Sequence, residues 1–225
     1  MEIKILYEDN HIIAVYKSAG VLVQGDISGD PNLLDGVKEF IKRRDQKPGN
    51  VFLGLVHRLD RPVSGIVIFA KTSKGASRIS EQFRNGEVTK IYHAVIEGKP
   101  KKDKDTLINY LKKDEDKKIS LVYDSPDKGG DYAELDYEVV RSAKDTSLLK
   151  IVLKTGRFHQ IRSQLSTIGH PIVGDKKYLP AGRQVAQLKD GGIALCATEI
   201  KFKKTTSEEI VHIKIDYPKE WSEPL

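Results

Sequence analysis

The sequence predicts an α+β fold with a mixed, mostly antiparallel sheet and flanking helices. Segments with the character of strands outnumber helical segments, and successive strands often meet through short turns, which favours antiparallel pairing over a doubly wound parallel sheet. The chain has 225 residues, of which 39% are hydrophobic and 31% charged. This balance is typical of a globular protein with a sizeable core. No break in composition marks a boundary, so we expect one domain over residues 1–225.

The strand predictions depend on short runs of apolar and β-branched residues. Residues 132–140 alternate most strictly, with Ala133, Leu135 and Tyr137 on one face. A continuous apolar run, by contrast, is typical of a strand buried on both faces. The expected strands cover residues 3–7, 12–16, 51–56, 65–70, 90–96, 132–140, 148–153 and 210–217, and the first two are expected to form a hairpin.

Three helices are expected from apolar residues at helical spacing. The first follows Asn32, and the second begins with Ser73 as its N-cap and ends before an Asn-Gly pair. The third covers residues 158–168. The segment that follows it, residues 169–178, contains Gly-His-Pro and Gly-Asp pairs typical of a helix end and a turn, so we expect it to be scaffold.

Charge and cysteine content narrow the class of protein. The chain has 38 Lys and Arg against 32 Asp and Glu, a formal net charge of +6. This permits a polyanionic partner without requiring one. One cysteine rules out an internal disulfide and argues against a cysteine-rich zinc site, and His159 and His170 lack the helical spacing of a metal pair. The sequence has no long apolar run and no signal peptide at its start, so we expect a cytoplasmic protein.

The segment of residues 56–65 is the strongest candidate for a site. It joins two runs that are expected to be buried strands, and a loop anchored in this way is a suitable place for catalytic residues. Asp60 stands in it between Arg58 and Arg61, whose guanidinium groups favour the ionised carboxylate. Asp60 therefore suits a nucleophile or an ion-pair partner better than a general acid. The alternative is a polar turn capped by Asp60.

A second candidate lies in the expected third helix. Its apolar stripe is formed by Phe158, Ile161, Leu165 and Ile168. Arg162 falls at the edge of this stripe, where a guanidinium must find an anion or remain partly unpaired at a cost of several kcal/mol. Asp60 is one candidate for the anion. Alternatively, the side chain extends past the stripe to water.

Tyr92 is the third candidate, on the expected strand 90–96. It shares a face with the small residue Ala94, which leaves room for a flat ring to stack on the tyrosine. The phenol can also donate a hydrogen bond or act as a base. The alternative is an aromatic residue that only packs in the core.

Three motifs in this order resemble the RluA-like family of RNA pseudouridine synthases. They are His57-Arg58-Leu59-Asp60, Tyr92-His93-Ala94-Val95, and Gly156-Arg157-Phe158-His159-Gln160-Ile161-Arg162. The resemblance extends over nearly the whole chain. The sequence departs from the usual pattern at Val63, at Tyr16-Lys17-Ser18, at Ser163-Gln164 and at Cys196.

The resemblance implies a bent sheet with a central RNA-binding cleft. It further implies that Asp60 is the catalytic aspartate, that Tyr92 stacks on uracil and handles a proton, and that Arg162 is the partner of Asp60. Arg58 is expected to enter the RNA. Further RNA contacts are expected from His57, Arg61, Arg157, His159 and Gln160. The S4-type N-terminal domain that family members often carry is not expected in this chain.

The expected activity is the isomerisation of specific uridines in ribosomal or transfer RNA to pseudouridine, after the base has been flipped out of the stack. No cofactor, nucleotide or metal is expected, and the protein is expected to be a monomer. Whether Asp60 attacks C1′ of the ribose, attacks C6 of the base, or assists loss of the 2′ proton is open. One competing hypothesis is an inactive RNA-binding protein of the same fold. Another is a hydrolase, which would need a second carboxyl group as proton donor.

Overall fold

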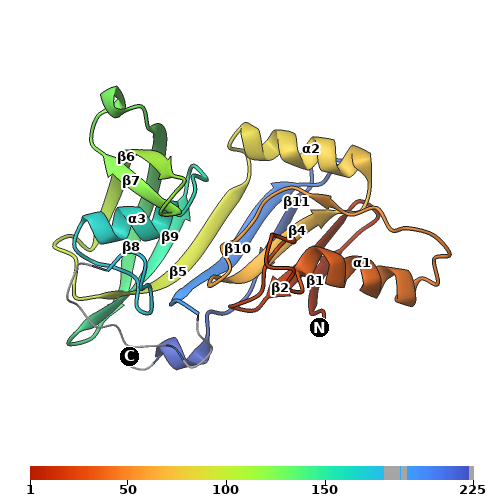
Figure 1. Ribbon diagram of the computed structural model, residues 1–225, viewed down its shortest axis with the longest axis horizontal. Coiled ribbons are helices and arrows are strands. Elements are labelled where there is room, and N and C mark those ends of the chain that lie inside the picture. The colour runs from red at the N-terminus through yellow and green to blue at the C-terminus, as the bar shows by residue number, and fades with distance from the viewer. Residues whose placement is uncertain (180–187, 189–191, 223–225) are drawn as a thin grey trace. The chain divides into compact units, whose positions relative to one another are not determined.

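The computed structural model describes residues 1–179, 188 and 192–222, and its chain divides into two compact units (Figure 1). Unit 1 comprises Met1–Val88 and Glu199–Ile215, and unit 2 comprises Thr89–Thr198 and the residues from Asp216 onward. Strand β10 (Leu195–Lys203) contributes its first four residues to unit 2 and the rest to unit 1.

The sheet of unit 1 is built around a fully buried strand. This strand, β4, pairs with β2 in antiparallel register from Ile12↔Ala70 to Lys17↔Gly65. The expected hairpin of β1 and β2 is present, and the strand order is β1-β2-β4-β10. The other two strands lie beside this path, β3 against β4 and β11 against β10. The bounds in unit 1 are β1 (Ile5–Glu8), β2 (Ile12–Lys17), β3 (Gly54–Leu55), β4 (Ser64–Ala70) and β11 (Ile210–Lys214).

Two capped helices belong to unit 1. Helix α1 (Leu33–Arg44) begins after Asn32, whose side chain accepts a hydrogen bond from the backbone of Asp35, as expected of an N-cap. Helix α2 (Ser73–Arg84) is capped by Thr72, which accepts from the backbone of Gly75. The prediction of Ser73 as the cap was therefore wrong by one residue, since Ser73 already has helical geometry.

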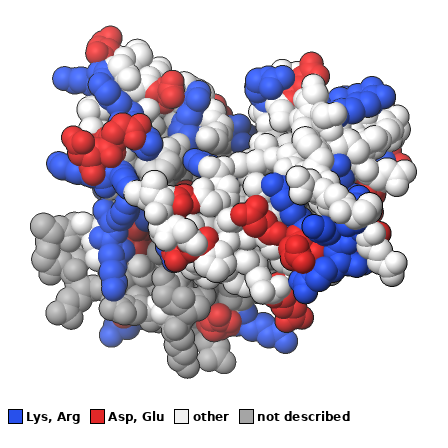
Figure 2. All heavy atoms as spheres, turned by 45° about the vertical axis from the view of Figure 1, so that its right-hand side comes forward, with Lys and Arg blue, Asp and Glu red and all other residues white. Residues whose placement is uncertain are grey.

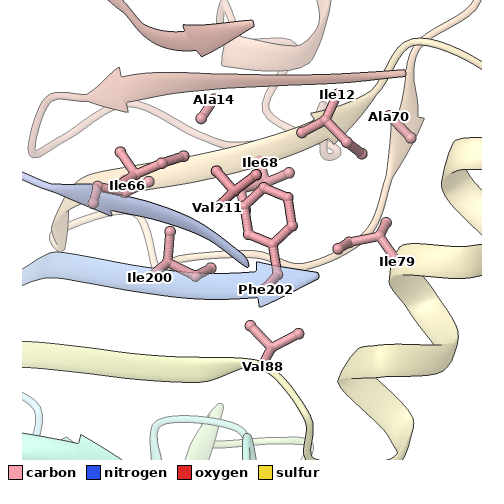
Figure 3. Close-up of a cluster of buried hydrophobic side chains, with 11 residues drawn as sticks. Ile12, Ala14, Ile66, Ile68, Ala70, Ile79, Val88, Ile200, Phe202 and Val211 are labelled. Carbon is pink, nitrogen blue, oxygen red and sulfur yellow. The ribbon is translucent and has the colours of Figure 1, made fainter. Parts of the chain in front are cut away.

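The core of unit 1 lies between the sheet and helix α2 (Figure 3). Strands β2 and β4 supply alternate aliphatic side chains, α2 supplies Ile79, Val88 comes from the segment before β5, and β10 and β11 supply the rest. Phe202 is the largest of these residues and is 1% exposed. The other residues of this cluster labelled in Figure 3 are Ile12, Ala14, Ile66, Ile68, Ala70, Ile79, Val88, Ile200 and Val211.

The expected strand over residues 51–56 was wrong except for Gly54–Leu55. Strand β2 occupies one edge of β4 and β10 occupies the other. Strand β3 therefore pairs only with the end of β4, as Gly54↔Ala70 and Leu55↔Phe69. The remaining residues of the apolar run are not in a strand, and Phe52 is 51% exposed. A continuous apolar run does not by itself make a strand when the neighbouring edge is occupied.

Unit 2 contains a five-stranded antiparallel sheet in the order β5-β9-β8-β6-β7. Three strands match expected ones: β5 (Thr89–Glu97), β8 (Asp131–Ser142) and β9 (Thr146–Leu153). The hairpin of β6 (Lys104–Asp114) and β7 (Ile119–Tyr123) was missed, as was β10. The lysine-rich segments 99–105 and 112–118 lie at the two ends of β6, and residues 115–118 form the turn to β7. One face of β6 is exposed, so its charges obscured the alternation.

Helix α3 (Gln160–Thr167) covers one face of this sheet (Figure 1). The Gln164 side chain donates to the Leu107 carbonyl at 3.2 Å and to Asn109 Oδ1 at 2.9 Å. Leu107 pairs with Leu135, so the covered face is the one that carries Leu107, Asn109 and Leu135.

The third helix is shorter than expected, because His159 has a left-handed backbone with φ of 51° and cannot be its first turn. The expected apolar stripe is only partly buried. Ile161 and Leu165 are 5% and 0% exposed, whereas Ile168 is 38% exposed.

These features confirm a mixed, mostly antiparallel sheet with few helices. The charged side chains on the face drawn in Figure 2 are of both signs and lie interspersed. In the described part of the chain, no helix is both long and apolar enough to cross a membrane.

Candidate functional site

The loop that carries Asp60 is tied to the segment after β2, within unit 1. The Gly20 backbone donates to the Arg61 carbonyl at 2.8 Å, and Arg61 Nε donates back to the Gly20 carbonyl at 3.0 Å. Within the loop the Val63 backbone donates to the Asp60 carbonyl at 3.0 Å, which closes a turn. Asp60 itself is half-buried. The loop is thus anchored to the segment after β2, so the Asp60 carboxylate stands on a fixed part of the chain.

Lys17, at the end of β2, completes this anchor. Its side chain is 0% exposed, and its ammonium donates to three carbonyls: Ser18 at 3.1 Å, Val21 at 2.7 Å and Arg61 at 2.9 Å. Burial lowers the pKa of Lys17 to about 8, and the nearby charge of Asp60 opposes that shift. The lysine therefore fastens the loop and supplies positive charge near Asp60.

The other predicted residues of this loop differ in how they are engaged. Arg58 is exposed and makes no hydrogen bond or ion pair with the residues that the structure describes. Arg61 is also exposed, but its guanidinium forms an ion pair with Asp30 at 2.8 Å. His57 Nε2 accepts a hydrogen bond from the Ile68 backbone at 2.9 Å, just where β3 leaves the edge of β4. Of the two arginines, Arg58 is the one available to a ligand.

Within unit 2, Tyr92 lies on the face of the sheet that α3 covers. Tyr92 pairs with Ile151, which pairs with Tyr137, so these three side chains share a face. Leu135 is two residues before Tyr137 and belongs to the face under α3. Tyr92 is 8% exposed. The structure thus brings two of the predicted site residues, Tyr92 and Arg162, to the same side of one sheet.

Arg162 is buried, at 4% exposed, and pairs with Asp175, at 1% exposed. Arg162 Nε donates to Asp175 Oδ2 at 2.6 Å, and Nη2 donates to Oδ1 at 2.8 Å. The guanidinium also lies over the ring of Tyr178, 5.2 Å from its centroid. The expectation that this arginine must find an anion was confirmed, and the alternative of an arginine that extends to water was wrong.

A second network surrounds His159, at the start of α3. His159 Nδ1 is hydrogen-bonded to the Tyr178 hydroxyl at 2.9 Å, and that hydroxyl accepts from the Ser120 backbone at 2.7 Å. Burial, aided by the positive charge of Arg162, lowers the pKa of His159 to about 3. His159 is therefore a neutral ring that links the turn before α3 to Tyr178.

Gln160 and Arg157 flank His159 and bind the main chain of β8. Gln160 is 3% exposed, and its side chain donates to the Glu134 carbonyl at 3.0 Å and accepts from the Arg157 backbone at 3.0 Å. Arg157 is exposed, and its Nε donates to the Tyr132 carbonyl at 2.9 Å. Both side chains fasten the segment that leads into α3.

Two residues of these networks were missed from the sequence. Asp175 was interpreted as part of a scaffold turn, although a carboxylate after a Gly is also a natural partner for a buried arginine. Lys17 was noted only as a departure in its motif, although a lysine at the end of an apolar strand is a signal of a buried cation. The predicted pairing of Asp60 with Arg162 joins residues of different units and stays a prediction.

Among the residues with described positions, no three His, Cys, Asp or Glu side chains are grouped so that they could hold a metal ion.

Comparison with known proteins gives the family. Residues 11–167 match the sequence profile described as RNA pseudouridylate synthase. The chain belongs to the RNA pseudouridylate synthase family. The resemblance drawn from the three motifs is thereby confirmed, and the match includes Asp60, Tyr92 and Arg162.

Individual relatives of this family member are bacterial. The chain is 36% identical over 179 residues to ribosomal large subunit pseudouridine synthase C of Buchnera aphidicola, a match that covers 78% of this chain and 54% of the relative. It is 31% identical over 236 residues to tRNA pseudouridine synthase C of Haemophilus influenzae, which covers 98% of this chain and 95% of the relative. The chain thus spans about half the length of some curated relatives that it matches and nearly all of others.

A solved structure shows that the fold is shared as well. The human protein named RNA pseudouridylate synthase domain containing 4 superimposes with a TM-score of 0.79 at 21% identity, over 97% of this chain and 90% of that chain. This similarity shows that the fold is shared over nearly the whole of this chain.

Proposed function

We propose that this protein isomerises uridine in RNA to pseudouridine, with Asp60 as the catalytic aspartate. The observation that carries the proposal is the family match over residues 11–167, which contains Asp60, Tyr92 and Arg162. It begins in unit 1 and continues through much of unit 2, which supports one catalytic domain that uses both. The names of the relatives support ribosomal or transfer RNA as the substrate.

The reaction breaks the bond between C1′ and N1 of uridine, turns the base, and joins C1′ to C5. The proton of C5 is lost and N1 gains one, so substrate and product are isomers and no redox cofactor is consumed. We propose that the target base is flipped out of the RNA stack, which costs a few kcal/mol. Phosphate contacts from basic side chains offset this cost.

Each proposed residue has features that suit its role. Asp60 is half-buried on an anchored loop, near the charge of Lys17, which suits a carboxylate that attacks C1′ or C6 or assists loss of the 2′ proton. Tyr92 presents a mostly buried ring for stacking on uracil and a hydroxyl for proton transfer. Arg162, held by Asp175, would pair with Asp60 and keep it ionised. Arg58, exposed and unengaged among described residues, would enter the RNA.

The other predicted RNA contacts remain part of the proposal. Arg61 and Arg157 are exposed and each carries guanidinium nitrogens that can reach a phosphate. His57, His159 and Gln160 would act mainly by fixing the loop and the start of α3 on which the arginines stand. We further propose that the protein works as a monomer in the cytoplasm without a cofactor.

The test is turnover of the Asp60→Asn variant. Unmodified ribosomal and transfer RNA transcripts with tritium at C5 of uridine would be incubated with each protein, and tritium release and the mass spectrum of the digested RNA recorded. Wild-type protein is expected to release tritium, and Asp60→Asn to give only background while RNA binding persists. Glu81→Gln, an exposed carboxylate on α2, is the matched control and should keep full activity.

Two outcomes would contradict the proposal. RNA binding by the wild-type protein without any pseudouridine in either RNA would identify an inactive RNA-binding protein. Turnover near the wild-type rate in Asp60→Asn would exclude Asp60 as the catalytic residue.

A further inference from the structure

Lys90 is a half-buried lysine on β5 that the proposed mechanism does not use. It stands two residues before Tyr92, so the two side chains lie on the same face of the strand, about 7 Å apart along it. That is the face of the unit 2 sheet under α3. Lys90 and Tyr92 therefore occupy neighbouring positions on one face of β5.

The fold satisfies this ammonium only in part. Lys90 Nζ donates to the Thr155 carbonyl at 3.1 Å, which uses one of the three donors of an ammonium group. No carboxylate of the residues with described positions forms an ion pair with it. Burial lowers the pKa of Lys90 to about 8. Lys90 is thus a desolvated cation whose charge the described part of the fold does not neutralise.

Lys17 shows what a structural lysine looks like in the same chain. Burial lowers its pKa to about 8 as well, but its ammonium donates to three carbonyls and has the charge of Asp60 nearby. These contacts explain why Lys17 is buried, since they fasten the loop that carries Asp60. Among the residues with described positions, Lys90 has one carbonyl and no counter-charge, so fastening a loop does not explain its burial.

The surroundings of Lys90 leave its ammonium open on one side. Gly156 follows the Thr155 carbonyl that orients Lys90, and a β-carbon at position 156 would lie 3.7 Å from Nζ. Because the residue is glycine, no side chain covers the ammonium there. A cation that is oriented, partly desolvated and uncovered is suited to an anionic ligand, because the pairing is stronger in a low dielectric than in water.

We propose that Lys90 binds a backbone phosphate of the RNA next to the uridine that Tyr92 receives. The inference rests on the proposed function, which supplies RNA as the ligand. A phosphate provides the negative charge that the ammonium lacks, and the two free N–H groups can donate to its oxygens. A uracil oxygen is neutral and would leave the charge uncompensated.

The experiment measures RNA affinity against salt. A fluorescein-labelled oligouridylate of about 15 nucleotides would be titrated with wild-type protein and variants by fluorescence anisotropy, at several KCl concentrations between about 50 and 300 mM. Lys90→Gln keeps a donor for the Thr155 carbonyl and removes the charge. Its Kd is expected to rise about tenfold, and the slope of log affinity against log salt to fall by about 0.7, the value for one phosphate on a single strand.

Two further variants make the result specific. Lys90→Arg keeps the charge and is expected to keep the salt slope. Lys150→Gln removes the same charge from β9, where Lys150 pairs with His93 and so lies on the opposite face from Tyr92, and it is expected to match wild type. The Tm of Lys90→Gln is expected to equal or exceed that of wild type, because a desolvated charge has been removed.

An unchanged salt slope in Lys90→Gln would overturn the inference, and combined with weaker binding it would indicate a neutral uracil oxygen as the ligand. A lower Tm with an unchanged slope would overturn it as well and identify a structural lysine. Failure of the wild-type protein to bind the oligouridylate would also overturn the inference.

The binding assay needs no turnover, so it separates this inference from the proposed function. Suppose that wild-type protein forms no pseudouridine but Lys90→Gln still shows the smaller slope of log affinity against log salt. This result would reject the proposed activity and support the phosphate contact. If wild-type protein is active but Lys90→Gln and Lys150→Gln bind RNA with the same affinity and salt slope, the proposed activity is supported and the phosphate contact is rejected.

Discussion

Units 1 and 2 each bury a cation beside a segment that carries a proposed catalytic residue, and they satisfy it differently. In unit 1, Lys17 is 0% exposed and donates to three main-chain carbonyls. In unit 2, Arg162 is 4% exposed and forms a bidentate ion pair with the carboxylate of Asp175. The lysine is held by backbone dipoles, and the arginine by an opposite charge.

The difference teaches how each segment depends on its surroundings. Carbonyls stay in place through the main chain, so the anchor of the Asp60 loop requires only that β2 and the loop fold. An ion pair removed from water requires both partners, since either charge alone is strongly destabilising. A guanidinium also stays charged at any ordinary pH, whereas a buried lysine can lose its proton. Unit 2 is therefore more vulnerable to a single substitution, whereas unit 1 contains a buried cation whose charge depends on pH.

Breaking the ion pair should have the largest effect on stability. Arg162→Met leaves Asp175 buried without its guanidinium, so the free energy of unfolding is expected to fall by about 3–5 kcal/mol. Turnover of RNA should fall strongly as well. Urea unfolding followed by circular dichroism measures the free energy of unfolding, and tritium release measures turnover. Lys144→Met, which removes an exposed cation from the turn between β8 and β9 of the same unit, is the control and should change stability by about 0.5 kcal/mol or less.

A double variant sharpens the interpretation. Adding Asp175→Leu to Arg162→Met removes the orphaned carboxylate and fills its place with an apolar side chain, so most of the lost stability should return. Turnover should not return, because the guanidinium is still missing. Recovery of turnover in the double variant would show that Arg162 acts only in folding.

Removing the lysine of unit 1 should have a smaller effect. Lys17→Met leaves three carbonyls without their donor but also removes a desolvated charge, so a loss of about 1–3 kcal/mol is expected. Turnover should fall because the Asp60 loop loses one of its fastenings. Lys38→Met, on the exposed side of α1, is the control. Equal turnover in Lys17→Met and wild type would show that the Gly20–Arg61 hydrogen bonds alone position the loop.

The pH dependence of unit 1 should be the smallest effect. The pKa of Lys17 is lowered by burial to about 8 in the folded protein, below its ordinary value near 10.5. Between these pH values the unfolded chain keeps the proton and the folded protein releases it, so the free energy of unfolding rises with pH. The penalty is fully present below pH 8 and is relieved above it.

Comparing wild type with Lys17→Met isolates this contribution, since the other titrating groups are common to both. From pH 8 to about 10 the stability of wild type relative to the variant should rise, by at most about 1.4 kcal/mol per pH unit. The free energy of unfolding is measured by urea unfolding at each pH for both proteins. A constant difference between wild type and Lys17→Met across this range would show that Lys17 keeps its proton.

Much of the fold and of the site was predictable from local patterns. Strict alternation predicted β8 with its buried residues, and apolar residues at helical spacing predicted α1. The expectation that Arg162 finds an anion was confirmed, while the catalytic roles of Asp60, Tyr92 and Arg162 stay predictions. Failures occurred where the pattern was incomplete. The hairpin of β6 and β7 was missed because one face of β6 is charged and exposed, and the start of α3 was placed too early because nothing local indicated the left-handed backbone of His159.

The order of residues thus accounts for most of the segments that become strands and helices and for the side chains proposed to carry the chemistry, because period, caps and motifs act over a few neighbouring residues. Only the packed chain decided how the buried charges are satisfied: Asp175 for Arg162, three carbonyls for Lys17 and one carbonyl for Lys90. The acceptors for Arg162, Lys17 and Lys90 include groups 13, 44 and 65 residues away in the chain. Distances through space, which set electrostatic and hydrogen-bond energies, arise only when distant segments meet.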